Sequence, residues 1–171
     1  MGKIDIERQK TLEDLNNKLR EYGKCLVVRG TGFGKTTMAS KLTKKYKKIL
    51  FLFPSKIIQV TANDVVHEEE TGEESEEYYI TDDFIGTQDG ELERSSKLQF
   101  QTYHMLVRDI NKTVPKCDWT GYDLIIADEC HRLGAKKTIV AIRDLLKLNP
   151  NAHFVGLSAT PERPDKKLCM D

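Results

Sequence analysis

The sequence predicts an α/β fold in which helices cover both faces of a parallel sheet, and three observations support this class. Five short runs are almost continuously apolar, which is typical of strands that are buried on both faces. Segments with the apolar spacing of a helix alternate with these runs. A turn with three glycines follows the first run, where a strand leads into a helix.

An amphipathic helix is expected first, over residues 6–22. The residues that recur on one helical face are Leu12, Leu15, Leu19 and Tyr22. Gly23 follows, and glycine commonly ends a helix because it adopts left-handed backbone angles. The first helix therefore has one apolar face for packing and a defined end.

Strands and helices then alternate along the chain. The expected strands are 25–29, 48–53, 97–103, 122–128 and 152–160. The expected helices between them are 35–46, 55–62, 103–111 and 137–148, the last with Ile139, Ile142 and Leu146 on one side. In such sheets ligands bind at the carboxyl ends of the strands, so we expect the chemistry there.

The length of 171 residues fits one domain, residues 1–171, with a core of its own. An acidic insertion at about residues 62–96 breaks the alternation, since residues 64–93 hold 13 acidic side chains and no lysine or arginine. We expect a solvated loop or a small hairpin there, without an assigned function. The net charge is zero, but residues 1–61 carry 14 basic against 5 acidic side chains and could attract a polyanion.

The cysteines and the hydropathy of the sequence indicate the cellular compartment of the chain. The cysteines are Cys25, Cys117, Cys130 and Cys169. They are scattered and form no closely spaced pair, so we expect reduced thiols rather than a cysteine metal site. The sequence shows neither a signal peptide nor an apolar run of membrane-spanning length, which predicts a cytoplasmic chain without membrane contact.

The glycine-rich turn has the residues of a phosphate-binding loop. Gly34, Lys35 and Thr36 lie at the strand-to-helix junction, where backbone N–H groups and the helix N-terminus attract an anion. Lysine reaches the outer phosphates and the threonine hydroxyl is a ligand for Mg²⁺. Arg29 stands where the general phosphate-loop pattern has its first glycine. The alternative is a glycine-rich turn without a ligand.

A pair of carboxylates supports the nucleotide interpretation. Asp128 and Glu129 close an apolar strand about 90 residues after the glycine-rich turn. Adjacent carboxylates at the end of a buried strand are costly unless they meet a cation or a water. In an Mg·ATP site, Asp128 would hold the metal shell and Glu129 would orient or deprotonate the attacking water.

Three segments in this order resemble motifs I, II and III of superfamily 2 helicases and translocases. They are TGFGKTT (31–37), DECH (128–131) and LSATP (157–161). The closer similarity is to bacterial DEAH/DECH-type proteins related to the translocating subunits of restriction enzymes. The resemblance implies a P-loop NTPase with a RecA-like sheet, and ATP and Mg²⁺ as cofactors. The loop residues it implies for ATP are Thr31, Gly32, Phe33, Gly34, Lys35, Thr36 and Thr37. The family usually has a small residue at position 29, so Arg29 is a departure that either points away from the phosphates or crowds the loop.

Weaker similarities extend the predicted site. IERQKTLEDL resembles the glutamine motif, in which Gln9 would pair with the adenine edge; the alternative is a solvated glutamine on a helix. FPSKIIQ and TYHML resemble motifs Ia and Ib, which implies contacts with the nucleic-acid backbone, although the spacing within the first is irregular. The residues concerned are Ser55, Lys56, Thr102 and Tyr103. The alternative for Tyr103 is a place in the core.

The resemblance also implies a coupling role for His131, Ser158 and Thr160, which link the nucleotide site to a second RecA-like lobe. That lobe supplies an arginine that we do not find here, since neither Arg143 nor Arg163 has a suitable place. We therefore expect this chain to be one lobe of a longer protein, which alone binds nucleotide weakly and hydrolyses it scarcely.

The expected partner is nucleic acid, with DNA favoured over RNA because of the restriction-like similarity alone. Two other functions stay open. A P-loop phosphotransferase would share the Gly-Lys-Thr loop but has no reason to carry the DECH segment or the SAT segment (158–160). A non-enzymatic nucleotide-binding or scaffold module would fit the departure at Arg29 and the acidic insertion.

Overall fold

The computed structural model describes residues 3–30, 33–34, 41–42, 45–54 and 98–160. The strands are β1 (Lys24–Val28), β2 (Ile49–Phe53), β3 (Leu98–Thr102), β4 (Leu124–Ala127) and β5 (His153–Ser158). The helices are α1 (Lys3–Tyr22), α4 (Tyr103–Asp109) and α5 (Lys136–Leu148), together with the short 3₁₀ helix η2 (Cys130–Gly134). The helices expected at 35–46 and 55–62 and the acidic insertion at 62–96 lie largely or wholly outside the described residues.

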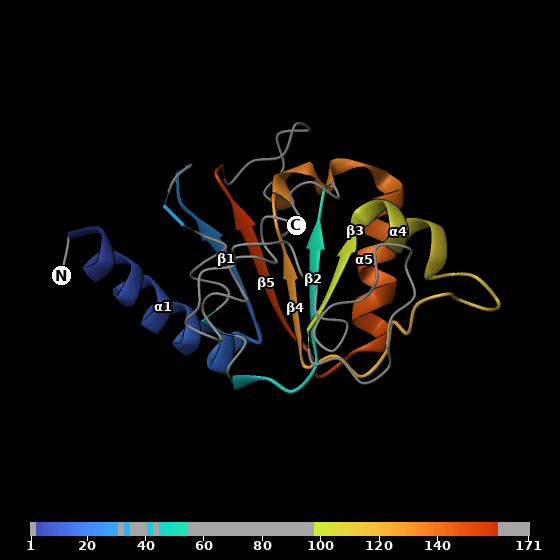
Figure 1. The fold of residues 1–171 in the computed structure, drawn as a ribbon, viewed down its shortest axis with the longest axis horizontal. Helices are drawn as coiled ribbons and strands as arrows, with labels where there is room; N and C mark the ends of the chain where they lie inside the picture. Colours follow the sequence, from blue (N-terminus) through green and yellow to red (C-terminus); the bar gives the residue numbers. More distant parts are fainter. Residues whose placement is uncertain (1–2, 31–32, 35–40, 43–44, 55–97, 161–171) are drawn as a thin grey trace, which may run out of the picture.

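The five strands form one parallel sheet in the order β1-β5-β4-β2-β3 (Figure 1). The predicted strands are therefore confirmed: the first is shifted by one residue, and each of the other predicted runs is one to three residues longer in total than the observed strand. At its carboxyl end β5 stops two residues before the expected run does, and β3 stops one residue before its expected run, at Thr102. Thr102 instead caps α4 by accepting a hydrogen bond from the Met105 amide, so the helix starts at Tyr103.

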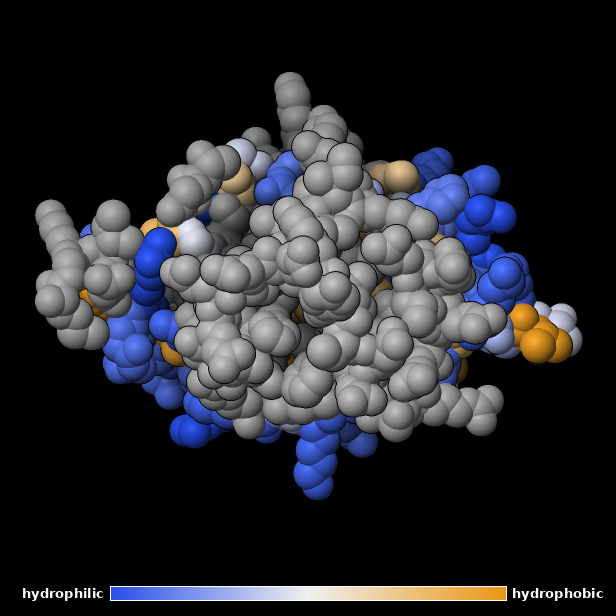
Figure 2. Space-filling model, in the orientation of Figure 1, coloured by the Kyte–Doolittle hydropathy of each residue, from blue (hydrophilic) through white to orange (hydrophobic). Residues whose placement is uncertain are grey.

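Each face of the sheet has its own core, because side chains alternate along a strand. Ile49, Phe51 and Phe53 of β2 pack on the face that also receives Leu15 and Leu19 of α1. On the opposite face, the core joins Leu50 and Leu52 of β2 to side chains of α4 and α5. This arrangement explains why the strands read as continuous apolar runs. On the view in Figure 2, the described residues around the margin are mainly hydrophilic.

Helix α1 ends as predicted but buries a narrower face. Gly23 has φ +68°, and its N–H donates to the Leu19 carbonyl at 2.9 Å. Leu15 and Leu19 are buried, and Leu12 is partly buried against the same core. The prediction that Tyr22 shares this face is wrong, because its side chain is 64 % exposed.

Helix α5 matches its expected range to within one residue, but its buried face is shifted. Ala141, Ile142 and Leu145 are buried, whereas Ile139 and Leu146 lie at the edges of that face. Asn149 ends the helix and is itself buried. Its side chain donates to the Trp119 and Leu145 carbonyls and accepts from the Tyr122 amide, which ties α5 to the segment before β4. No helix in the described ranges has the length and apolar character needed to cross a membrane.

Candidate nucleotide site

The strand order brings three separate segments to one edge of the sheet. Strands β1, β5 and β4 are neighbours, and all five strands run in the same direction (Figure 1). The glycine-rich turn follows β1, the SAT segment follows β5, and the carboxylate pair follows β4. The Arg29 amide donates to the Ser158 carbonyl at 3.1 Å, so the β1–β5 contact continues to the start of the turn. The segments that carry the predicted chemistry are therefore adjacent.

Part of the glycine-rich turn is described. The Phe33 amide faces the Gly30 carbonyl at 3.4 Å, and Gly34 has φ +76°, a conformation that favours glycine. The other predicted nucleotide-binding residues of the turn lie outside the described residues: Thr31, Gly32, Lys35, Thr36 and Thr37.

Arg29 turns toward helix α1. Its guanidinium donates to the Thr11 hydroxyl at 3.2 Å and to the Val28 carbonyl at 3.0 Å. The same group lies over the Phe33 ring, with Cζ 5.6 Å from the ring centroid, at the edge of cation–π range. The residue that departs from the family pattern is thus exposed and contacts the outer side of the turn.

The two carboxylates have different surroundings. Asp128 is 5 % exposed; its amide donates to the Leu52 carbonyl, and its Oδ1 accepts from the Glu129 amide at 2.9 Å. Glu129 is half-buried and has φ 49° and ψ 42°. A side chain other than glycine rarely adopts these left-handed angles, and such strain concentrates at functional sites. Carboxylate oxygens at this position have the hard-donor chemistry that Mg²⁺ prefers, so the residues present fit the metal.

His131 connects the carboxylate segment with the SAT segment. Its Nε2 lies 3.2 Å from Glu129 Oε2, and its Nδ1 lies 2.9 Å from Ser158 Oγ. The Ser158 hydroxyl in turn donates to the Thr160 carbonyl and accepts from the Thr160 amide. Ser158 is fully buried and His131 is half-buried. The structure therefore brings together four predicted residues at the carboxyl ends of β4 and β5: Glu129, His131, Ser158 and Thr160.

Tyr103 lies in the core rather than on an open surface. Its side chain is 7 % exposed, and its hydroxyl donates to the Asp128 carbonyl at 2.5 Å. Burial raises the pKa of Tyr103 well above its ordinary value, so the hydroxyl stays protonated as a donor. Thr102 uses its hydroxyl as the cap of α4. Of the residues predicted to touch nucleic acid, these two have structural roles, and Ser55 and Lys56 lie outside the described residues.

Gln9 lies on the exposed side of α1, where its amide donates to Glu13 at 3.0 Å. The neighbouring residue, Arg8, instead reaches the glycine-rich turn and donates from Nε to the Phe33 carbonyl at 2.8 Å. Arg8 was not among the predicted site residues. Position 8 falls on the same helical stripe as Leu12, Leu15 and Leu19, which indicates only that its side chain points toward the protein.

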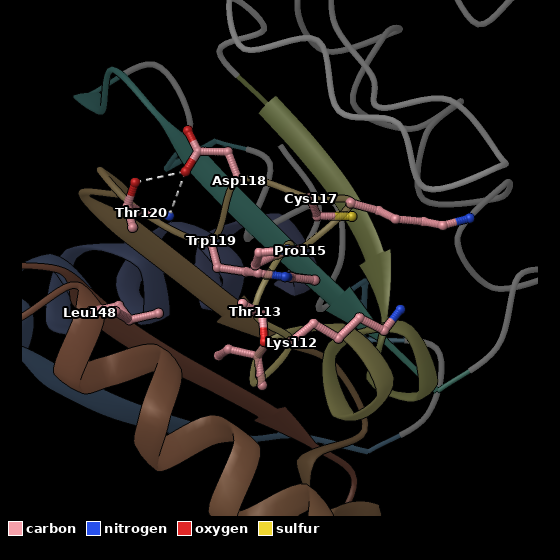
Figure 3. A pocket seen from close by; sticks show the side chains of 10 residues that line it. Lys112, Thr113, Pro115, Cys117, Asp118, Trp119, Thr120 and Leu148 are labelled. Atoms are coloured by element: carbon pink, nitrogen blue, oxygen red, sulfur yellow. Dashed lines mark hydrogen bonds between the residues drawn. The ribbon is translucent and has the colours of Figure 1, made fainter.

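A separate hollow of about 660 Å³ lies beside the segment between α4 and β4 (Figure 3). Residues 110, 112–113, 115–120 and 148 line it. Figure 3 shows the Asp118 carboxylate turned toward Thr120, whose amide and hydroxyl both donate to it. This segment leads into the amino end of β4, whereas Asp128 follows the carboxyl end. The hollow is therefore distinct from the candidate nucleotide site.

Comparisons with known proteins agree with this arrangement. A family model described as the Res subunit of type III restriction enzymes matches residues 5–163. No curated protein gives a significant match.

Solved structures are similar over most of the chain. The helicase domain of Pyrococcus furiosus Hef has TM-score 0.68 and 24 % identity, over 91 % of this chain and 34 % of that one. A hypothetical ATP-dependent RNA helicase from Sulfolobus tokodaii has TM-score 0.63 and 18 % identity, over 94 % and 51 %. The Sulfolobus solfataricus SWI2/SNF2 ATPase core in complex with dsDNA has TM-score 0.60 and 16 % identity, over 91 % and 31 %. These likenesses show the fold, and they confirm the predicted RecA-like sheet of P-loop NTPases. The chain spans from 31 % to 51 % of the length of these structures.

Proposed function

Because the chain belongs to the family of the Res subunit of type III restriction enzymes, we propose that it is the ATP-binding lobe of a nucleic-acid-dependent ATPase. The observation that carries this proposal is the meeting of the glycine-rich turn, the carboxylate pair and the SAT segment at three adjacent strand ends. A phosphotransferase needs the first two of these segments but has no use for a histidine link to the third.

Each residue has a distinct proposed role. The turn amides and Lys35 bind the phosphates, and Thr36 and Asp128 hold Mg²⁺. When bound, Mg·ATP supplies the phosphoryl group that is transferred to water. Glu129 orients the attacking water and accepts its proton. The Glu129 carboxylate stands 3.2 Å from His131 Nε2, so it is fixed from one side by the histidine.

His131 and Ser158 would carry the state of the nucleotide site to the SAT segment. Their contact joins the ends of β4 and β5, and Thr160 lies at the exposed end of the resulting chain of hydrogen bonds. We propose that Thr160 faces a second RecA-like lobe in the longer protein. This lobe would supply the arginine that stabilises the departing phosphate.

Nucleic acid is the proposed partner, and DNA is favoured. The family is that of a restriction-enzyme subunit, and one similar structure is of an ATPase core bound to dsDNA. Since Thr102 and Tyr103 are used inside the fold, the proposed contact with the nucleic-acid backbone rests on Ser55 and Lys56. Hydroxyl and lysine side chains bind phosphates without reading sequence.

The test is a calorimetric titration with a slowly hydrolysed Mg·ATP analogue. We expect Lys35→Ala to weaken binding by about 10- to 100-fold, because a hydrogen bond to a charged group contributes about 1.5–3 kcal/mol. Lys47→Ala is the matched control: Lys47 is exposed and precedes β2, at the opposite edge of the sheet. Equal binding by the Lys35→Ala variant and the parent chain would exclude a phosphate-binding role for the loop. A folded chain that binds no nucleotide would favour a scaffold module.

A further inference from the structure

Helix α1 contacts the glycine-rich turn through one side chain that the family resemblance does not assign. Arg8 donates from Nε to the Phe33 carbonyl at 2.8 Å, across 25 residues of sequence. The side chain is half-buried between the helix and the turn. A charge-assisted hydrogen bond in such a position is stronger than one between neutral groups. The contact therefore fixes the orientation of the peptide that joins Phe33 to Gly34.

The Arg8 guanidinium also lies flat against Gly34. A Cβ at position 34 would be 2.9 Å from Nη2, 3.2 Å from Cζ and 3.3 Å from Nε of Arg8. Real Cβ atoms do not approach heavy atoms as closely as the first of these distances, so any larger residue at position 34 would displace the guanidinium from its present place. Gly34 has a second requirement for glycine in its φ of +76°.

Arg29 ties the same turn to the same helix. Its guanidinium bonds to Thr11 and lies over the Phe33 ring. Arg8 and Thr11 are three residues apart and therefore share a face of α1. Arg8 contacts the carbonyl of Phe33 and Arg29 contacts its ring, so this one residue is held from two directions.

From these contacts we propose that Arg8 is a positioning residue of the nucleotide site, and that it, rather than Gln9, is the residue of α1 on which phosphate binding depends. Arg8 holds the 33–34 peptide in the conformation of the bound state and places a fixed positive charge beside the turn. The proposal rests on the proposed function. It concerns the phosphate part of the nucleotide and not the base, because Arg8 contacts the turn itself.

Two probes distinguish an effect on phosphate binding from an effect on base binding. They are the slowly hydrolysed Mg·ATP analogue and inorganic tripolyphosphate with Mg²⁺, which has no base. We expect Arg8→Ala to weaken the binding of both by a similar factor of about ten. Arg8→Lys keeps the charge but lacks the planar donor group, so it should recover part of this loss for both probes. Lys10→Ala is the matched control, because it removes an exposed cation from the same helix, and it should leave the binding of both probes unchanged.

The thermal unfolding midpoint of each variant is measured as well, to distinguish an effect on phosphate binding from an effect on the stability of the fold. If Arg8 only supported the fold, its replacement would lower the midpoint but leave the affinity of the folded protein for tripolyphosphate unchanged, and this result would overturn the proposal. Should Arg8→Ala not fold, Arg8→Lys decides, and parental affinity for both probes would overturn it. A folded parent chain that binds neither probe would instead overturn the proposed function, and the role of Arg8 with it.

Discussion

His131 engages both of its ring nitrogens within the protein, one with Glu129 and the other with Ser158. A histidine held on two sides has little freedom to rotate. A displacement of Glu129 would therefore shift the ring and its contact with Ser158, and the reverse also holds. Ser158 is fully buried, and its hydroxyl is further bonded to the Thr160 backbone. At the scale of single residues, this is the contact through which the carboxylate segment and the SAT segment depend on each other.

A double-mutant cycle measures this dependence. We expect His131→Ala and Ser158→Ala to show a coupling energy of about 1 kcal/mol in the free energy of unfolding, the usual contribution of one hydrogen bond. Urea unfolding of the four proteins, followed by the fluorescence of the single tryptophan, supplies the values. His104→Ala is the control, because His104 is exposed on α4. Additive effects of the two substitutions would show that the contact between His131 and Ser158 contributes no coupling energy to stability.

At the scale of elements, the segment between α4 and β4 is organised by one buried carboxylate. Asp109 is fully buried and accepts from the Lys116 amide at 3.0 Å, the Cys117 amide at 2.9 Å and Trp119 Nε1 at 3.0 Å. Lys112 adds a cation at 3.2 Å. Burial acts to raise the pKa of Asp109, but these hydrogen bonds outweigh it and lower the pKa below its ordinary value. Burial of the neighbouring Cys117, next to Asp109, raises its pKa to about 12.

Asp109→Ala should destabilise the protein by about 2–4 kcal/mol at neutral pH, since it leaves several buried donors without an acceptor. The pH dependence has a definite sign. Because the folded-state pKa is lowered, the contribution of Asp109 is complete above its unfolded pKa of about 4 and is lost as the pH falls through the folded value. The parent chain and Asp109→Asn should therefore converge in stability in acid.

Unfolding followed by Trp119 fluorescence reports this segment directly, because the indole itself donates to Asp109. Asp144→Asn is the control. Asp144 also has a lowered pKa, through hydrogen bonds from Lys147 and Asn111, but it lies in a solvent-exposed pair whose contribution to stability is small. A constant difference between the parent chain and Asp109→Asn from pH 7 down to pH 3 would contradict the role given to the Asp109 charge.

These elements also show which features were accessible to sequence reasoning. Strands β2 and β4 are buried on both faces, and full burial leaves an uninterrupted apolar pattern that is hard to mistake. Local sequence patterns say less about the direction in which a polar or aromatic side chain points. The sequence left Tyr103 either as a nucleic-acid contact or as a core residue, and the structure has it in the core, directly after the Thr102 cap at which the strand ends and α4 begins. Arg8 was missed because an arginine on an amphipathic helix is ordinarily solvated, and its contact with Phe33 depends on tertiary placement.

At the scale of the whole molecule, the parallel sheet carries the candidate nucleotide site at one edge and a second group of polar contacts at the other. The carboxyl ends of β1, β5 and β4 carry the candidate nucleotide site. Near the amino end of β4, Lys48 binds Asp118 at 3.1 Å and the Thr120 carbonyl at 2.7 Å, and Asp123 accepts from the Lys47 and Lys48 amides. Substitutions at this second edge should change stability without changing nucleotide affinity.

If the site is shared between two lobes, as proposed, the rate of ATP hydrolysis by this chain alone can be predicted. The similar helicase structures extend well beyond the region that this chain covers, to about two or three times its span. If a second lobe supplies the arginine that stabilises the departing phosphate, residues 1–171 should hydrolyse ATP more slowly than the complete motor by a factor of about 10³ to 10⁵. Steady-state phosphate release should then stay near the level of the Lys35→Ala variant and should not respond to added DNA. The rate per chain should also be independent of protein concentration. A rate that rises with concentration would show that one copy completes the site of another. Fast turnover at low concentration that Lys35→Ala abolishes would show instead that this one sheet holds every group that hydrolysis requires.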